Sequence, residues 1–358
     1  MYSLKRRSPV YGVWHGKTSL TEHSEVRFKI ATFFLLFFLI LLTFSPITSS
    51  GEEDNVGWDQ ASISTDVDLN DVVALNETSA IAVGDNGKIY RTQDSGSNWS
   101  EMDSGVILDL NSIELNVTGG VDCSHTPCQA IVVGDSGTVL INDADSWIDI
   151  SIDGAGNLYD LSIPHFESLA NSTFFVSGTG GEIWKWNDNS WTDLSNNTGT
   201  TIDIYAVDFI SDGKTGFGVG ANGLIIATND GGLVWEFRDI PDEFKDFSYY
   251  DLFLSEYCYP STGDCVPVSL VVVGENGTII QSPKINNVIG YVWRVPSNDE
   301  PHPTNTTNTI RSISYSSNQK FWVVGDNNYI ALTEDGGNSF YNLSQIQNIG
   351  TDFTGVSF

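Results

Sequence analysis

Basic side chains are scarce in this sequence, which has 16 lysines and arginines against 46 aspartates and glutamates and a net charge of −30. Six of the basic residues lie within residues 1–29, so the rest of the chain is more acidic still. An acidic surface repels the phosphates of nucleic acids. The composition therefore excludes nucleic acid as a partner of the main body of the chain.

Enzyme motifs are absent as well. The sequence has no nucleophile elbow, no phosphate-binding glycine loop, no HExxH pair and no dinucleotide fingerprint. After residue 50 it also lacks the apolar spacing of amphipathic helices, and short β-branched or aromatic segments alternate with turn residues instead. We therefore expect a non-enzymatic, all-β protein with no cofactor and no metal site.

Cysteine is rare, with four residues that form two close pairs, Cys123 with Cys128 and Cys258 with Cys265. An even number of cysteines in close pairs predicts two disulfides in an exported protein. A four-cysteine zinc site is the alternative, but neither pair has the two-residue spacing that such sites favour. The sequence therefore favours two loop-closing disulfides.

Only one long hydrophobic run is present, and it covers residues 30–50. Its uninterrupted apolar part is shorter than the about 20 residues of a membrane span, but weakly polar neighbours extend it. Basic residues before it and small residues after it are typical of an export signal. We expect 1–29 to stay in the cytoplasm and 30–50 to form one hydrophobic helix, cleaved as a signal peptide or kept as a membrane anchor. Residues 56–358 are expected outside the cytoplasm, anchored to the membrane or secreted if the signal is cleaved.

An internal repeat organises the rest of the chain. A glycine that ends an apolar run marks it and recurs about every 50 residues: Gly84, Gly134, Gly178, Gly220, Gly274 and Gly325. This period, with four short β segments in each unit, predicts a β-propeller of six complete four-stranded blades. The predicted blades span about 66–103, 104–151, 152–195, 196–240, 241–297 and 298–344.

The two ends of the repeat region add a partial seventh blade. Residues 57–65 resemble the last strand of a blade, and 351–358 resemble the first. Either the protein has six blades plus this remnant, or the sequence is cut short of a full seventh blade, and the unpaired edge at 351–358 favours the second. In this ring the two cysteine pairs fall in loops of the second and fifth units, near opposite sides, so that one zinc ion could not bind both.

Three connections inside the repeat share the pattern Thr-x-Asp-x-Gly-x-x-aromatic, the Asp-box. Its positions are Asp94, Gly96 and Trp99; Asp230, Gly232 and Trp235; and Asp335, Gly337 and Phe340. The carboxylate can accept backbone N–H bonds, the glycine can take positive φ, and the aromatic ring can cover the blade edge. These residues are therefore predicted to be structural, with catalysis or calcium binding as the alternative.

The combined pattern VGxxGxIxxTxDGGxxW resembles the photosystem II stability and assembly factors of plants and cyanobacteria, over roughly residues 56–358. More distantly, it is similar to Asp-box proteins such as sialidases. The resemblance implies a lumenal propeller that assists assembly of a reaction-centre subunit through an arginine-rich surface patch, with the Asp-box turns at the periphery. This chain differs from the family in the arginine-rich patch, because its repeat region contains only Arg91, Arg238, Arg294 and Arg311.

The first strand of each blade lines the central channel, and its second and third residues are expected at one mouth of the channel. The candidate binding residues are Asn70, Asp71, Asn111, Tyr159, Asp160, Tyr205, Tyr250, Asp251 and Arg311. Tyrosines and carboxylates that converge on one opening could bind a peptide or a cationic group. The alternative is a solvated channel lining with hydrogen bonds between blades.

Two functions are compatible with this fold. The first is a non-enzymatic scaffold that binds a protein or peptide partner and attaches to a membrane through residues 30–50. The second is a sialidase-like glycosidase or a carbohydrate-binding propeller. A sialidase site needs three arginines on the substrate carboxylate, and only Arg311 lies near the predicted mouth. The sequence therefore favours the scaffold.

Overall fold

The computed structural model describes residues 13–17, 63–115, 129–143, 146–168, 171–283, 293, 304, 306–317, 319–343 and 352–357. Within these ranges the secondary structure consists of strands and short 3-10 turns. No helix in the described part of the chain is both long enough and apolar enough to cross a bilayer. The predicted hydrophobic helix at 30–50 and the cysteine pair Cys123–Cys128 lie outside the described residues.

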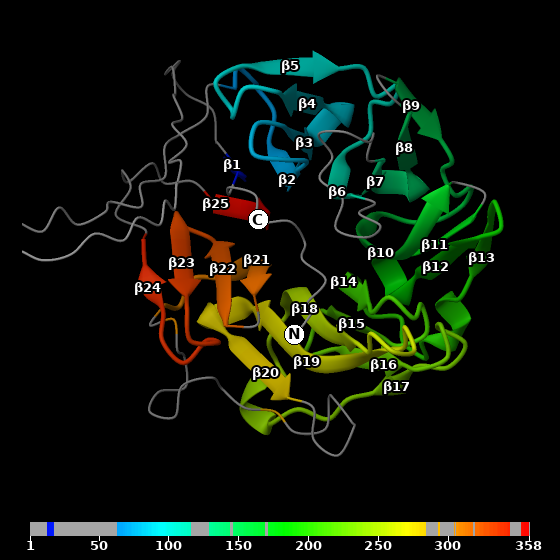
Figure 1. Cartoon of the computed structure of the whole chain (residues 1–358), viewed down its shortest axis with the longest axis vertical. Helices are drawn as coiled ribbons and strands as arrows, with labels where there is room; N and C mark the ends of the chain where they lie inside the picture. The colour runs from blue at the N-terminus through cyan, green and yellow to red at the C-terminus, as the bar shows by residue number, and fades with distance from the viewer. Residues whose placement is uncertain are drawn as a thin grey trace, which may run out of the picture.

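The described strands form seven sheets, and six of them are antiparallel blades arranged around a common centre, which confirms the predicted six-bladed β-propeller (Figure 1). Blade one contains β2 (Leu69–Ala74), β3 (Ala80–Gly84), β4 (Ile89–Thr92) and β5 (Trp99–Met102). Blade two contains β6 (Leu110–Leu115), β7 (Ala130–Gly134), β8 (Val139–Asp143) and β9 (Ser146–Asp149). Blade three contains β10 (Leu158–Ser168), β11 (Asn171–Gly178), β12 (Ile183–Asn187) and β13 (Ser190–Asp193).

The remaining blades follow the same order. Blade four contains β14 (Ile204–Phe209), β15 (Gly216–Gly220), β16 (Ile225–Thr228) and β17 (Glu236–Phe237). Blade five contains β18 (Tyr249–Cys258), β19 (Cys265–Gly274) and β20 (Ile279–Pro283). Blade six contains β21 (Ile310–Ser317), β22 (Lys320–Gly325), β23 (Tyr329–Thr333) and β24 (Tyr341–Asn342). The fourth strand predicted for blade five falls where only Trp293 is described, and Trp293 is not in a strand.

The hydrophobic core is divided among the interfaces between consecutive blades. Between blades one and two, for example, Ile81 and Val83 of β3 pack with Ile113 of β6 and Val132 of β7. The last five residues of the second strand are buried in every blade, because both faces of this stretch pack against apolar side chains. Burial on both faces explains the continuous apolar runs before each repeat glycine. A strand with one exposed face would instead alternate apolar and polar residues.

Tight turns follow the second strand in each blade. Four are 3-10 turns before the third strand: η1 (Asp85–Gly87), η2 (Asp135–Gly137), η3 (Thr179–Gly181) and η6 (Glu275–Gly277). Two more 3-10 turns, η4 (Ser195–Asn197) and η5 (Asp242–Phe244), lie in the connections between blades. In η1 the central Asn86 has φ 56 and Gly87 has φ 70. This explains the Asn-Gly pairs, since asparagine and glycine tolerate positive φ.

The repeat glycine itself is required by close backbone contact. It ends the second strand with extended φ, as at Gly84, where φ is −168°. A Cβ at Gly325 would lie 2.0 Å from the carbonyl oxygen of Thr309, the residue just before β21. The first and second strands therefore approach too closely at this point for any side chain.

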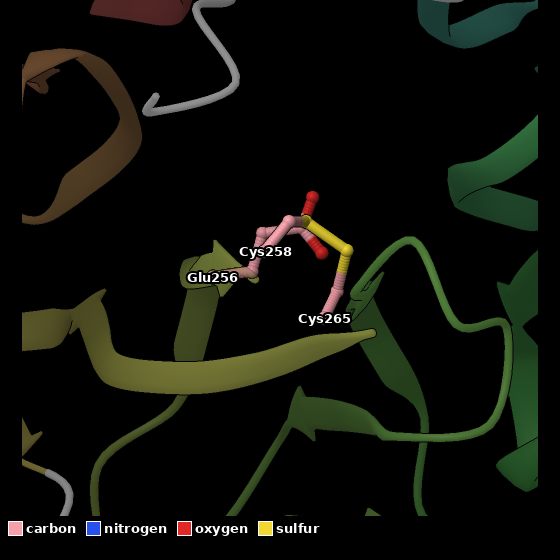
Figure 2. A group of neighbouring side chains, drawn as sticks. All are labelled: Glu256, Cys258 and Cys265. Carbon is pink, nitrogen blue, oxygen red and sulfur yellow. A yellow bond between two sulfur atoms is a disulfide. The ribbon is translucent and has the colours of Figure 1, made fainter. Parts of the chain in front are cut away.

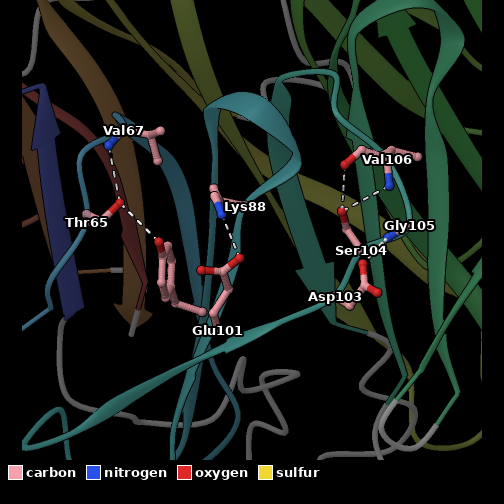
Figure 3. Close-up of polar contacts among 9 residues, drawn as sticks. Thr65, Val67, Lys88, Glu101, Asp103, Ser104, Gly105 and Val106 are labelled. Atoms are coloured by element: carbon pink, nitrogen blue, oxygen red, sulfur yellow. Dashed lines mark hydrogen bonds and ion pairs between the residues drawn. The ribbon is translucent and has the colours of Figure 1, made fainter.

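The outer part of blade one is held by polar contacts, which Figure 3 shows. The Tyr90 hydroxyl donates to Thr65 Oγ1 at 3.2 Å and joins β4 to the segment before β2. At the edge, Lys88 Nζ lies 2.6 Å from a carboxylate oxygen of Glu101 on β5. The ends of the blade are therefore fixed by side chains as well as by strand pairing.

The predicted partial seventh blade is not confirmed. Asp352–Ser357 does form a strand, β25, next to β21 of blade six and β2 of blade one. Its partner in the sheet is β1 (Val13–Lys17). Of residues 57–65, only 63–65 are described, and these are not in a strand. Phe353 and Val356 of β25 pack on apolar side chains of blade six and cover the face of that blade that points away from blade five.

Candidate functional site

A β-bulge opens the inner strand of every blade. In β2 the pairing register shifts between Leu69 and Asp71, and the same shift occurs at the same place in the other five inner strands. A bulge leaves one residue out of the ladder and redirects its side chain. The six bulge residues are Asn70, Asn111, Tyr159, Tyr205, Tyr250 and Arg311. The predicted mouth residues at the second strand position are therefore these bulge residues.

The two asparagines bridge adjacent blades. Asn70 Nδ2 donates to Asp85 in its own blade and to the carbonyl of Leu110 in blade two, both at 3.0 Å. Asn111 repeats this arrangement, with bonds to Asp135 at 3.0 Å and to the carbonyl of Leu158 in blade three at 2.8 Å. Both side-chain amides are used inside the fold, so their first role is to join blades.

The three tyrosines form a continuous row across blades three to five. The rings of Tyr159 and Tyr205 meet edge to face, with centroids 5.4 Å apart, and those of Tyr205 and Tyr250 stack at 5.4 Å. Arg311 extends the row, because its guanidinium carbon lies 4.8 Å from the Tyr250 ring centroid. The guanidinium also binds Asp326 through two nitrogen atoms, at 2.7 and 3.2 Å. We call Tyr159, Tyr205, Tyr250 and Arg311 the tyrosine row.

Below the tyrosine row, carboxylates of alternate blades bind the next inner strand. Asp71 accepts the amide of Ile113, Asp160 that of Val207 and Asp251 that of Ile313, each at 2.9 Å. These three aspartates were predicted at the mouth as candidate binding residues. The structure gives each of them a hydrogen bond between blades.

Blades two and four supply the same contact one layer deeper. Glu114 accepts the amide of Ile163 at 3.1 Å, and Asp208 accepts the amide of Leu254 at 3.0 Å. Asp208 also accepts the Ser162 hydroxyl of blade three at 3.2 Å and is buried, with 8% of its surface exposed. Sequence reasoning missed both residues because it compared the second and third strand positions only. The sequence did carry a signal for them. An acidic residue stands at the third position of the inner strand in blades one, three and five, and at the fifth position in blades two and four.

The aspartates of the channel have perturbed acidity. Burial raises the pKa of Asp251 to about 7, with repulsion from Asp71 as a further cause. Burial, followed by repulsion from Asp251, raises the pKa of Asp160 well above its usual range. The charged forms of both groups are therefore costly in the folded protein, although each accepts backbone amides.

This cost predicts a pH dependence of stability. Between about pH 4 and pH 7 folded Asp251 keeps a proton that the unfolded chain releases, so acidification favours the folded state. Because the carboxyl is only partly buried, we expect a gain of about 2 kcal/mol in the free energy of unfolding from pH 8 to pH 5. Urea unfolding at both pH values measures it. Asp251→Asn should show a smaller gain than the wild type, and an equal gain would contradict the assignment.

The three Asp-box turns share one hydrogen-bond pattern at the outer part of the blades. In the first, Thr92 Oγ1 donates to Asp94 at 3.0 Å and accepts the amide of Gly96 at 3.0 Å, while Asp94 accepts the amide of Asn98 at 2.8 Å. The side-chain and backbone bonds from Asn98 lower the pKa of Asp94. The turns at Asp230 and Asp335 repeat these bonds, and Gly232 and Gly337 have positive φ. The aromatic residues Trp99, Trp235 and Phe340 pack against the blades.

The second cysteine pair lies where β18 and β19 meet. Cys258 and Cys265 are paired in the ladder and joined by a disulfide, with Glu256 beside them (Figure 2). These three residues are the one group of metal-binding type that the described residues bring together. Both sulfurs are used in the disulfide, and Glu256 accepts the amide and hydroxyl of Ser211 in blade four. The group therefore has no thiolate to offer a metal.

Comparison with known proteins agrees with this architecture. No protein-family model and no curated protein sequence matches the chain. A structure of YCF48 bound to D1 peptide is 16% identical with a TM-score of 0.57, covering 82% of this chain and 86% of that one. YCF48 from Cyanidioschyzon merolae is 12% identical with a TM-score of 0.54, covering 80% and 88%. The WD40 β-propeller domain of Doa1 is 14% identical with a TM-score of 0.54, covering 78% and 83%. At these identities the similarity establishes the β-propeller fold.

Proposed function

We propose that this protein is a non-enzymatic scaffold that binds a protein or peptide partner at the channel mouth. The observation that carries this proposal is the tyrosine row, in which three rings in contact and a guanidinium span four neighbouring blades. Tyrosine and arginine are enriched at the energetic centres of protein interfaces. Tyrosine rings offer large, rigid contact area at low entropic cost.

The resemblance to photosystem II assembly factors supports a binding role of this kind. Two similar structures are of YCF48, and one of them holds a D1 peptide. The arginine-rich patch that the resemblance implies is not available in the same form, since the repeat region has only four arginines.

The glycosidase alternative is less well supported. A sialidase-like site needs three arginines around one substrate carboxylate. At the mouth, Arg311 is committed to Asp326 and to the Tyr250 ring. We therefore propose that the mouth binds its partner without catalysis.

We also propose that residues 56–358 lie outside the cytoplasm, through export directed by residues 30–50. The hydrophobic run and the Cys258–Cys265 disulfide support this location, because disulfides persist in oxidising compartments. An anchor at 30–50 would place 13–17 on the other side of the membrane from β25, and cleavage would remove 13–17. In either case β25 would lose β1 as its partner.

Photo-cross-linking from the mouth tests the scaffold. A p-azidophenylalanine in place of Tyr159 keeps the ring shape, and the same group in place of Tyr341 reports on the exposed outer strand β24. In extract from the source organism we expect one dominant cross-linked protein from position 159 and none from position 341. Equal labelling from the two positions, or no adduct from position 159, would contradict binding at the mouth.

A further inference from the structure

In five of the six blades the bulge side chain binds a residue of the same blade, the first residue of the turn after the second strand. The pairs and their shortest distances are Asn70 with Asp85 (3.0 Å), Asn111 with Asp135 (3.0 Å), Tyr159 with Thr179 (3.1 Å), Tyr250 with Glu275 (3.4 Å) and Arg311 with Asp326 (2.7 Å). The turn residue therefore fixes the polar end of the bulge side chain. The hydrogen-bonding group of each of these five side chains is therefore used within its own blade.

Blade four breaks the pattern. Its turn residue is Ala221, whose methyl group can form no hydrogen bond, and the bulge residue is Tyr205. Within the described residues the Tyr205 hydroxyl has no hydrogen-bond partner, and it is not among the buried polar atoms without partners, so it contacts solvent. Burial of the ring, with Asp203 nearby, raises the pKa of Tyr205. The hydroxyl therefore keeps its proton at neutral pH and can both donate and accept.

Tyr205 is nevertheless held in place. Its ring contacts Tyr159 on one side and stacks on Tyr250 on the other. A ring fixed on two sides loses little conformational entropy on binding, so its hydroxyl is preorganised for a ligand. The free hydroxyl is thus in the middle of the tyrosine row, the place where interface energy usually concentrates.

Negative charge surrounds this position. Asp203 accepts the amide of Gly180 at 2.7 Å, and Glu275 accepts the amide of Ser248 at 3.0 Å. In the described part of the chain neither carboxylate has a lysine or arginine partner, and both are close enough to act on the charge state of Tyr205. A cationic group at the hydroxyl would gain a hydrogen bond and the field of both carboxylates. Arg311 on Tyr250 shows that this row accepts a guanidinium on a ring.

We propose that the Tyr205 hydroxyl is the anchoring contact for an arginine or lysine side chain of the partner peptide, left free by Ala221. This inference rests on the proposed binding role of the mouth and names the chemistry that the mouth selects. The partner's cation would donate to the phenol oxygen and lie between Asp203 and Glu275. The outer strands and the Asp-box turns take no part.

Two substitutions remove the contact in different ways. Tyr205→Phe deletes the hydroxyl and keeps the ring. Ala221→Thr keeps the hydroxyl but offers it the partner that Thr179 gives Tyr159, so the chain itself would occupy it without a change in charge. Tyr341→Phe is the matched control, because it deletes a tyrosine hydroxyl on the exposed outer strand β24, away from the tyrosine row.

The probe is a fluorescein-labelled peptide of glycine and serine with one central arginine and blocked ends, titrated against the full chain and followed by fluorescence anisotropy. We expect Tyr205→Phe and Ala221→Thr each to weaken binding about tenfold, which corresponds to one charged hydrogen bond. Tyr341→Phe should change the affinity less than twofold. The same peptide with glutamine or glutamate at its centre should bind at least about tenfold more weakly.

The outcomes separate this inference from the proposed function. If Tyr205→Phe and Ala221→Thr bind the arginine peptide as the wild type does, or if the glutamine peptide binds equally well, the inference is wrong. If the partner cross-linked from position 159 is undiminished by excess arginine peptide, the mouth binds its partner by other chemistry, and the scaffold function stands. Absence of that cross-link counts against the function itself. Circular dichroism of each variant confirms that the fold is retained.

Discussion

Replacing Gly325 by alanine is expected to lower the free energy of unfolding by more than about 3 kcal/mol. The new Cβ would lie 2.0 Å from the carbonyl oxygen of Thr309 and 2.9 Å from the Cα of Ile310. Both contacts are with backbone atoms, so no side chain can rotate away, and β21 and β22 must separate. Urea unfolding monitored by tryptophan fluorescence measures the loss.

Gly154→Ala is the matched control for this prediction. Gly154 has φ +83 and no neighbouring atom within 4 Å of the added methyl group, so its substitution tests backbone strain without a clash. We expect a loss of about 1 kcal/mol. Equal losses at positions 154 and 325 would show that the close approach of the two strands costs no more than backbone strain at an open turn, and would contradict this explanation of the repeat glycine.

Asp208→Ala is expected to cost about 3 kcal/mol of stability. The buried carboxylate accepts the Leu254 amide of blade five and the Ser162 hydroxyl of blade three, so truncation leaves both donors without this acceptor in three packed blades. Asp208→Asn keeps one acceptor oxygen and should lose less. Chemical denaturation with a two-state fit provides the values.

Asp239→Ala controls for the loss of one negative charge. The side chain of Asp239 is 98% exposed and lies 3.5 Å from Lys245, so its removal should change stability by less than about 0.5 kcal/mol. A loss at position 208 no larger than that at position 239 would mean that the carboxylates of the channel do not hold the blades together.

Strand order and blade number were predictable from the sequence because each blade is a local unit with its own hydrophobic pattern. The register of the repeat glycines identified six units, and the Asn-Gly turns placed the second and third strands. The reason for the glycine was not predictable, since the carbonyl of Thr309 approaches Gly325 only in the folded blade. The partner of 351–358 was not predictable either, because pairing between distant segments leaves no local pattern.

The candidate site was predicted as a set of aligned positions, and the structure divides that set by contact. Asn70 and Asn111 join blades, whereas the rings of Tyr159, Tyr205 and Tyr250 contact one another in one row. The bulge that presents them depends on backbone pairing and has no residue signature. The sequence does show that Ala221 stands where the other five turns have a residue that can form a hydrogen bond. Its effect on Tyr205 could not be predicted, because only the structure shows that the turn residue contacts the bulge residue.

The five contacts that join a channel carboxylate to a backbone amide of the neighbouring inner strand all run in one direction along the chain. Asp71, Glu114, Asp160, Asp208 and Asp251 each bind an amide that lies later in the sequence, in the next blade. A ribosome therefore delivers each of these five acceptors before its amide donor. Each of the first five blades leaves the exit tunnel with a carboxylate whose inner-strand amide partner lies in the following blade, so the growing ring carries one incomplete contact at its C-terminal edge. Assembly of this propeller is vectorial, and a chaperone that protects it during synthesis would have to follow that moving edge.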